Sequence, residues 1–224
     1  MLDRGIGGIE ARGYQVSSEL GWIACAGGPG LLRCSLVARR LSNSIGIDDA
    51  PFDRSHRGDV TIVGVVFTRT RLDGVMTGKL RRDGSNATQA IAELIEGSPF
   101  AAHAQVILLG GITFAGFNVA DIHVLHERLA TPVLVLARRK PRYAIIRETL
   151  LTKVPGGAAK WALIKKAGDM EPCCGLWVQR AGLELEQAAQ VIRDLTIHGK
   201  LPEPVRIAHL VAGGFVDGCS RGRA

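Results

Sequence analysis

The sequence predicts an α/β fold with a mixed sheet, in which three antiparallel strands precede parallel strand–helix units and helices flank the sheet. A short apolar run at 44–50 ends at Pro51, which cannot donate the backbone hydrogen bond that a sheet needs. Two runs rich in β-branched residues, 59–69 and 72–82, flank a short polar break and are typical of a hairpin. Apolar runs and a helical period between 104 and 136 indicate a strand–helix–strand unit with a right-handed crossover.

The first run carries two adjacent acids, Asp48 and Asp49, at its carboxyl end. A carboxylate at the end of a central strand is costly to bury without a partner, so it usually meets a cation, a metal ion or solvent in a cleft. Asp48 is therefore the first candidate metal ligand. The alternative is a solvated Asp–Asp turn with no chemical role.

The third strand is expected to bring Asp83 to the same edge of the sheet as Asp48. If strand one also pairs with strand two, strands one and three run in the same direction and their carboxyl ends share an edge. Asn86 and Gln89 resemble a capping pair that opens a helix over 87–96. Asp83 is thus a second candidate, although the helix dipole alone also favours an acid just before a helix.

The parallel unit consists of a buried strand at 104–109, a helix at 119–129 and a second strand at 132–136. Ligands collect at the carboxyl ends of such strands in open sheets. Four basic residues follow the last strand at that edge: Arg138, Arg139, Lys140 and Arg142. We predict that this cluster contacts phosphate groups, although a charge run of this kind can also be merely solvated.

The rest of the chain is predicted to be mostly helical. Helices are expected over 143–151, 158–166, 184–198 and 202–212, with a short strand near 176–178. Residues 1–40 have irregular spacing and many glycines, so we expect a peripheral or poorly ordered amino-terminal arm. Residues 41–224 form the predicted folded domain.

Composition narrows the class of protein. The 224 residues are 46% hydrophobic, which is enough for one sizeable core. Lysine and arginine number 28 against 21 acids, and this balance of +7 fits a polyanionic partner such as nucleic acid. The five cysteines are odd in number and lack metal-ligand spacing, which favours a reducing cytoplasm and no structural zinc. No apolar run is long enough to cross a bilayer, so we expect a soluble protein without a membrane partner.

Three stretches of the sequence, in order, resemble the endonuclease dU family, a relative of endonuclease V. They are residues 45–52 (IGIDDAPF), 111–119 (GITFAGFNV) and 202–209 (PEPVRIAH), and the resemblance covers about 44–224. It implies a ribonuclease H-like fold and an endonuclease of DNA repair that acts on DNA with deaminated bases, deoxyuridine in particular. It also implies a divalent metal ion, magnesium or manganese.

The resemblance also implies roles for single residues. Asp48 matches the acid at the end of strand one, and Asp83 matches the acid that opens the first helix. Arg138 matches a lysine that related enzymes place near the scissile phosphate. We therefore expect Asp48, Asp83 and Arg138 to be catalytic, with Asp48 and Asp83 as metal ligands.

Two positions of the endonuclease V pattern lack a ligand in this chain. The third acid falls at Gly110, and the fourth group, a histidine or acid, falls near Ala181–Gly182. Two acids suit one magnesium ion, which keeps most of its waters, better than the two ions of two-metal cleavage. Asp49 is the nearest candidate for a third ligand, although it reaches the edge only if the strand has already ended. Asp121 is a second candidate.

The glycine-bearing loop at 111–119 is predicted to contact nucleic acid. Phe117 is expected to stack on or wedge against a base and Asn118 to read a base edge, and Thr113 and Arg139 are also expected to contact the nucleic acid. The alternatives are that Phe117 anchors the loop to the core and that Asn118 caps the next helix. His209 lies in an apolar helix, where a core histidine is the expected interpretation.

A rival function remains open at this level. A nucleic-acid-binding protein that kept the fold and lost its acids would explain the missing carboxylates. An enzyme of small-molecule metabolism on the same fold has no supporting cofactor motif. The sequence leaves the oligomeric state undetermined.

Overall fold

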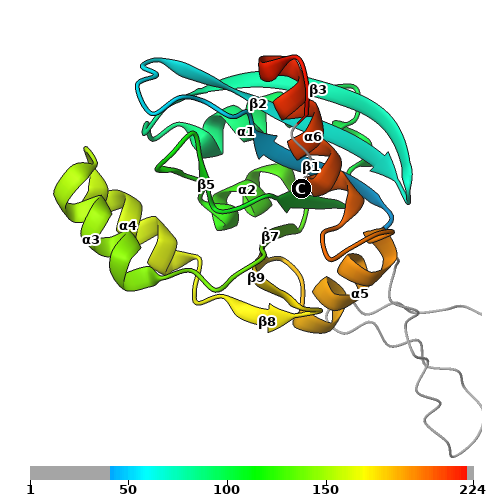
Figure 1. Cartoon of the computed structure of the whole chain (residues 1–224). Coiled ribbons are helices and arrows are strands. Elements are labelled where there is room, and N and C mark those ends of the chain that lie inside the picture. Colours follow the sequence, from blue (N-terminus) through cyan, green and yellow to red (C-terminus); the bar gives the residue numbers. More distant parts are fainter. Residues whose placement is uncertain (1–40, 221–224) are drawn as a thin grey trace, which may run out of the picture. The chain divides into compact units, whose positions relative to one another are not determined.

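The computed structural model describes residues 41–220, and a seven-stranded mixed sheet forms its centre (Figure 1). The strands of this sheet are β1 (Asn43–Asp49), β2 (Asp59–Thr68), β3 (Arg71–Arg81), β4 (Val106–Leu109), β7 (Val133–Ala137), β8 (Glu171–Cys173) and β9 (Leu176–Ala181). Their order across the sheet is β3-β2-β1-β4-β7-β9-β8. The predicted arm at residues 1–40 lies outside the described residues.

The pairing confirms the predicted mixed sheet. β2 is antiparallel to both β1 and β3, whereas β4 is parallel to β1 and β7 is parallel to β4. The carboxyl ends of β1, β3, β4 and β7 therefore share one edge of the sheet. β9 and β8 extend the sheet with antiparallel pairs beyond β7.

Helices cover both faces of the sheet (Figure 1). The helices are α1 (Ala87–Glu96), α2 (Ile122–Leu129), α3 (Tyr143–Lys153), α4 (Gly157–Lys166), α5 (Leu185–Leu195) and α6 (Glu203–Asp217), with a 3-10 turn at Ala101–His103. α1 and α2 pack on one face, where Ile91 and Leu125 join the largest buried cluster. α5 and α6 pack on the opposite face, where Val191 and Ala208 are buried.

The α3–α4 pair stands apart from the sheet faces and follows the carboxyl end of β7 (Figure 1). A small cluster of apolar side chains attaches it to the rest of the fold. Leu150 of α3 and Ile164 of α4 are buried together with Val119 in this cluster. The pair thus forms one side of the region beyond the carboxyl edge.

The predicted helix at 119–129 begins later than expected, at Ile122. The residues before it form a separate two-stranded ribbon, β5 (Thr113–Phe114) and β6 (Asn118–Val119). The last helix is longer than predicted, because it continues through Gly213 and Gly214 to Asp217. Among residues 41–220, no helix combines the length and the apolar character that a membrane crossing requires.

Candidate active site

β1 presents its two acids to opposite faces of the sheet. Side chains alternate along a strand, and Ile45 and Ile47 point into the core beneath α1 and α2. Asp48 therefore faces α6, while Asp49 faces the β5–β6 ribbon. Asp49 was expected to join Asp48 only if the strand ended before it. Because β1 extends through Asp49, the two side chains point in opposite directions.

His209 of α6 is the closest polar partner of Asp48. Its Nδ1 lies 2.9 Å from Oδ2 of Asp48, and 47% of its side chain is exposed, so the predicted core histidine is wrong. The hydrogen bond to Asp48 raises the pKa of His209. At this position a carboxylate and an imidazole, two common metal-binding groups, lie side by side.

Gly46 explains how α6 reaches Asp48. A Cβ atom at this position would lie 2.3 Å from the backbone of Pro204, so only glycine lets the helix lie this close to β1. Gly46 and Asp48 are two residues apart on the strand, and Pro204 and His209 are five residues apart on the helix. Each of these spans is about 7 Å long. Asp48 and His209 consequently meet where both elements approach the carboxyl edge.

Asp49 is largely buried on the other face. Its Oδ2 accepts a 2.8 Å hydrogen bond from the backbone N–H of Ala115. Burial and then the negative charge of Asp48 raise the pKa of Asp49 to about 6. Both causes act against the charged form of Asp49, because burial removes its hydration and a neighbouring negative charge repels it.

Gly110, where the third acid was expected, faces Asp48 directly. A Cβ atom at Gly110 would lie 2.9 Å from Oδ1 of Asp48. The missing side chain thus leaves a space in front of that carboxylate. The other empty position, Gly182, lies against the ring of His126 and not at Asp48. His209 is the group from the last helices that reaches the site.

Asp83 is held in one orientation by three parts of the chain. Its φ angle is +50°, and its Oδ1 accepts a 2.8 Å hydrogen bond from the backbone N–H of Phe117. Nε of Arg82 lies 3.3 Å from its Oδ2. The buried Lys160 of α4 donates a hydrogen bond to its backbone oxygen. Asp49 and Asp83 therefore bind the same loop tip, at Ala115 and Phe117, from two sides.

The predicted loop residues have different surroundings. Asn118 is fully buried: its Oδ1 accepts from the N–H of Ala87, and its Nδ2 donates to the backbone oxygen of Arg81 and to Asn86. It thus supports the start of α1, the preceding helix, instead of capping the next one. Asn86 does not cap α1 with its own side chain.

Phe117 and Thr113 are half-buried. Phe117 packs against the buried cluster beneath α3 and α4, which matches the anchoring alternative. Asp121 caps α2 through the N–H groups of His123 and Val124 and pairs with Lys166 at 2.7 Å. These contacts fix Asp121 to its own helix.

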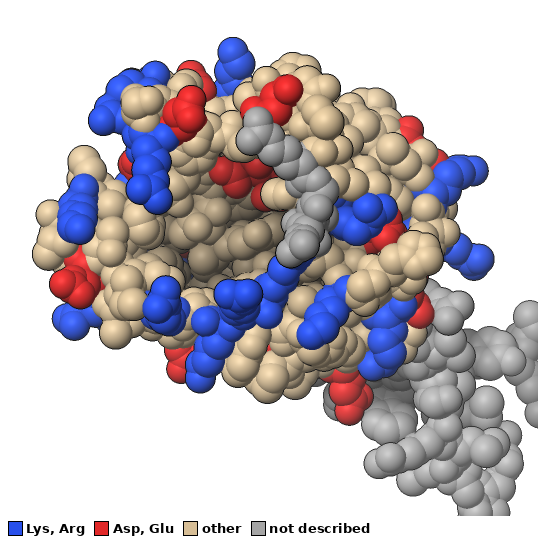
Figure 2. Space-filling view, in the orientation of Figure 1, with Lys and Arg blue, Asp and Glu red and all other residues tan. Residues whose placement is uncertain are grey.

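A pocket of about 600 Å³ is lined both by Asp48, the predicted metal ligand, and by Arg138, the predicted phosphate contact. Its described lining residues are Asp48, Gly110, Leu136, Ala137, Arg138, Arg139, Leu201, Val205 and His209. Arg138 and Arg139 are exposed, and the positive charge of Arg138 acts on His209 to lower its pKa against the effect of Asp48. Figure 2 shows a hollow in this view, with acidic side chains inside it and lysine and arginine side chains along its rim.

The residues present fit a single divalent ion better than a pair of ions. Within residues 41–220, no three His, Cys, Asp or Glu side chains form a ready metal-binding group. Asp48 and His209 nevertheless lie together, and the Cβ-sized space at Gly110 faces a carboxylate oxygen. A magnesium ion held by one or two protein groups takes its other ligands from water and phosphate oxygens.

Comparisons with known proteins agree with the resemblance in sequence. The family model described as "Endonuclease dU" matches residues 40–216. A UPF0215 protein of Deinococcus radiodurans is 53% identical over 184 residues, which cover 82% of this chain and 94% of that protein. A UPF0215 protein of Methanothermobacter thermautotrophicus is 42% identical over 187 residues, which cover 80% of this chain and 90% of that protein.

Solved structures share the fold. A protein of unknown function from Archaeoglobus fulgidus superposes with a TM-score of 0.73 at 30% identity, over 78% of this chain and 98% of that chain. An endonuclease V from Bacillus subtilis superposes with a TM-score of 0.51 at 14% identity, over 76% and 79% of the two chains. The ribonuclease H-like fold expected from the sequence is thereby confirmed.

Proposed function

The chain belongs to the endonuclease dU family, and we propose that it is a metal-dependent endonuclease of DNA repair. Its substrate is DNA that contains deaminated bases, deoxyuridine in particular. The observation that carries this proposal is the meeting of Asp48, His209 and Arg138 in one pocket at the carboxyl edge of the sheet. A carboxylate and an imidazole can bind a divalent ion, and a guanidinium can stabilise the negative charge that develops on a phosphate group during cleavage.

Asp48 and His209 would hold one divalent ion, magnesium or manganese. A bound ion of this kind supplies positive charge that stabilises the attacked phosphate group. Asp49 adds negative charge behind Asp48, and a cation nearby would favour its ionised form. Asp83 is proposed as a further catalytic and metal-binding carboxylate, held in place by Phe117 and Arg82.

Arg138 and Arg139 would bind the DNA backbone at the rim of the pocket. Both side chains are exposed and line the pocket that contains Asp48. A guanidinium can donate two hydrogen bonds to one phosphate group. Arg138 is the residue that we expect to stabilise the charged transition state. Thr113 and Phe117 are proposed to support the DNA strand from the loop between β4 and α2.

A non-catalytic DNA-binding protein is the second candidate, and Gly110 is the observation that favours it. The carboxylate expected at this position is absent, so fewer protein groups are available to hold a catalytic ion. The two candidates differ in one measurable property, which is whether DNA is cut when a divalent ion is supplied.

The deciding experiment is a nicking assay on labelled DNA with a single deoxyuridine, in single-stranded and duplex form. We expect cleavage at the lesion with magnesium or manganese, none with a chelator, and none when thymidine replaces the deoxyuridine. Asp48→Asn should abolish cleavage and keep or strengthen DNA binding, because it removes a negative charge and a metal ligand together.

Asp73→Asn is the matched control, since Asp73 lies in the β2–β3 hairpin at the opposite end of the sheet. It should cut as the unaltered protein does. Binding of deoxyuridine DNA without nicking at any concentration of either ion would instead support the non-catalytic candidate. Undiminished cleavage by Asp48→Asn would refute the assignment of Asp48.

A further inference from the structure

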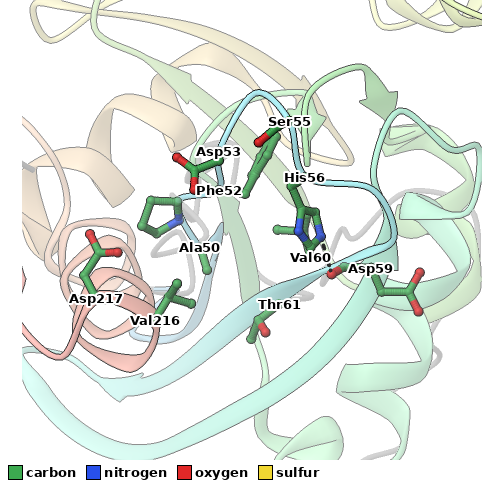
Figure 3. A pocket seen from close by; sticks show the side chains of 11 residues that line it. Ala50, Phe52, Asp53, Ser55, His56, Asp59, Val60, Thr61, Val216 and Asp217 are labelled. Carbon is green, nitrogen blue, oxygen red and sulfur yellow. Dashed lines mark hydrogen bonds between the residues drawn. The ribbon is translucent and has the colours of Figure 1, made fainter.

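A second hollow lies beside the candidate active site, between the loop after β1 and the carboxyl end of α6 (Figure 3). Its volume is about 740 Å³. Ala50, which lines it, follows Asp49 directly, and Val216 lies about two turns of α6, or ~10 Å, beyond His209. The hollow is therefore within reach of a DNA strand bound at Asp48. In B-form geometry ~10 Å corresponds to about three nucleotides.

The walls of the hollow are suited to a flat ring. Phe52 and Val216 supply apolar surface to the hollow (Figure 3), and Pro51 also lines it. The rings of Phe52 and His56 lie 6.3 Å apart with a tilt of 54°. Aromatic side chains of this kind bind nucleobases by stacking, whatever their sequence.

The acidic groups of the hollow are better suited to a hydrogen-bond donor than to a phosphate group, although Asp59 also pairs with Arg81 at 3.5 Å. Three of the described lining residues are the acids Asp53, Asp59 and Asp217, and none of them is a lysine or an arginine. Carboxylates repel phosphate groups but accept hydrogen bonds from the exocyclic amino groups of adenine, cytosine and guanine. The composition of the lining thus fits the base of a nucleotide better than its phosphate group.

The loop that forms the hollow is fixed by Arg82. One terminal nitrogen of the Arg82 guanidinium donates to the backbone oxygens of Arg54 and His56. The central carbon of the same guanidinium lies 5.4 Å from the centre of the Phe52 ring. Nε of His56 lies 3.0 Å from the backbone oxygen of Asp59 and ties the other end of the loop. A preformed wall loses little entropy when a base binds to it.

We propose that this hollow, defined by Phe52, His56, Asp53 and Val216, binds a DNA base near the lesion that carries an exocyclic amino group. The site is separate from the pocket that contains Asp48 and Arg138, because the two share none of their described lining residues. The inference rests on the proposed function, since the base belongs to the DNA strand that the active site holds.

The test asks whether the base at one position near the deoxyuridine contributes to binding only when Phe52 is present. Single-stranded DNA with one deoxyuridine is prepared with an abasic residue at each neighbouring position in turn. Binding is measured by fluorescence anisotropy in the Asp48→Asn background, so that the strand stays intact. We expect one position at which loss of the base weakens binding about tenfold. Phe52→Ala should remove that dependence, Phe52→Tyr should keep it, and thymine at that position should bind more weakly than adenine or cytosine.

A second pair of variants separates the hollow from the stability of the loop. Val216 and Phe215 are adjacent exposed residues of α6, but only Val216 lines the hollow. Val216→Glu should weaken binding at the coupled position alone, and Phe215→Glu should not. DNA binding with no position coupled to Phe52 or Val216 would overturn this site and leave the nuclease proposal standing. Absence of DNA binding by the unaltered protein would overturn both.

Discussion

Gly110 determines how much room lies in front of Asp48. An alanine Cβ would come within 2.9 Å of Oδ1 of Asp48 and would have to displace that carboxylate. The backbone of Gly110 is compatible with alanine, and the lower entropy of the unfolded chain, worth ~0.4–1 kcal/mol, offsets part of the cost of moving the carboxylate. We therefore expect Gly110→Ala to cut deoxyuridine DNA at least tenfold more slowly, with a Tm close to that of the unaltered protein. Equal cleavage rates would show that the space is not used.

Asp49 gives the protein a distinct dependence of stability on pH. Its folded-state pKa, raised from 3.8 to about 6 by burial and by Asp48, means that the folded state favours the protonated acid. The contribution of Asp49 to stability is therefore full below about pH 4 and is lost as the pH rises through 6. The loss amounts to at most ~3 kcal/mol.

Asp49→Asn isolates this effect, because asparagine keeps the oxygen that accepts from Ala115. In the presence of a chelator, urea unfolding should give equal stabilities for the two proteins near pH 4. Above pH 7 the variant should be more stable by up to ~3 kcal/mol. A constant difference across this pH range would mean that Asp49 ionises normally.

Some site residues could be predicted from local sequence and others depend on contacts between distant segments. Asp48 was predictable because an apolar run followed by Pro51 places an acid at a strand end. His209 was missed because its neighbours in sequence are apolar, and its exposure depends on how α6 lies on β1 at Gly46. The match of 202–209 to a family motif was the one available signal.

At the scale of elements, α1 depends on a side chain from another part of the chain. Asn118 bonds to the backbone of Ala87 and Arg81 from inside the protein. Asn118→Ala would leave the buried N–H of Ala87 unpaired, whereas the backbone oxygen of Arg81 also accepts from the N–H of Gly84. We therefore expect a loss of about 1–3 kcal/mol in the free energy of unfolding. Urea titration measures this loss. An unchanged stability with weaker DNA binding would instead support the role of Asn118 in reading a base.

The principal strands and helices were predictable because each has its own period, but their ends follow tertiary contacts. The ribbon formed by β5 and β6 has only two residues in each strand, too few for a periodic signal. α6 passes through Gly213 and Gly214, which cost about 1 kcal/mol each in a helix. Burial of Ala208 and Ala212 against β1 and β2 offsets that cost. Sequence alone places the helix end too early.

At the scale of the whole molecule, the positive charge is useful only where it meets the phosphate backbone. The chain carries a net +7, but acids line both hollows near the carboxyl edge. The proposed binding mode requires a division of roles, in which cations on the rim hold the backbone and acids inside act on ions or bases. Salt dependence of binding measures the first of these roles directly, because each phosphate contact releases counterions.

Arg138→Gln with Arg139→Gln removes two charges from the rim of the active-site pocket. If each guanidinium contacts a phosphate group, the slope of log K against log salt concentration should become shallower by about one to two. Arg69→Gln with Arg71→Gln removes the same net charge at the β2–β3 turn, which lies beside the amino end of β1. This pair should leave the slope unchanged, because only a local contact, and not the overall charge, sets it. Equal slopes for the two double variants would place the DNA elsewhere on the surface.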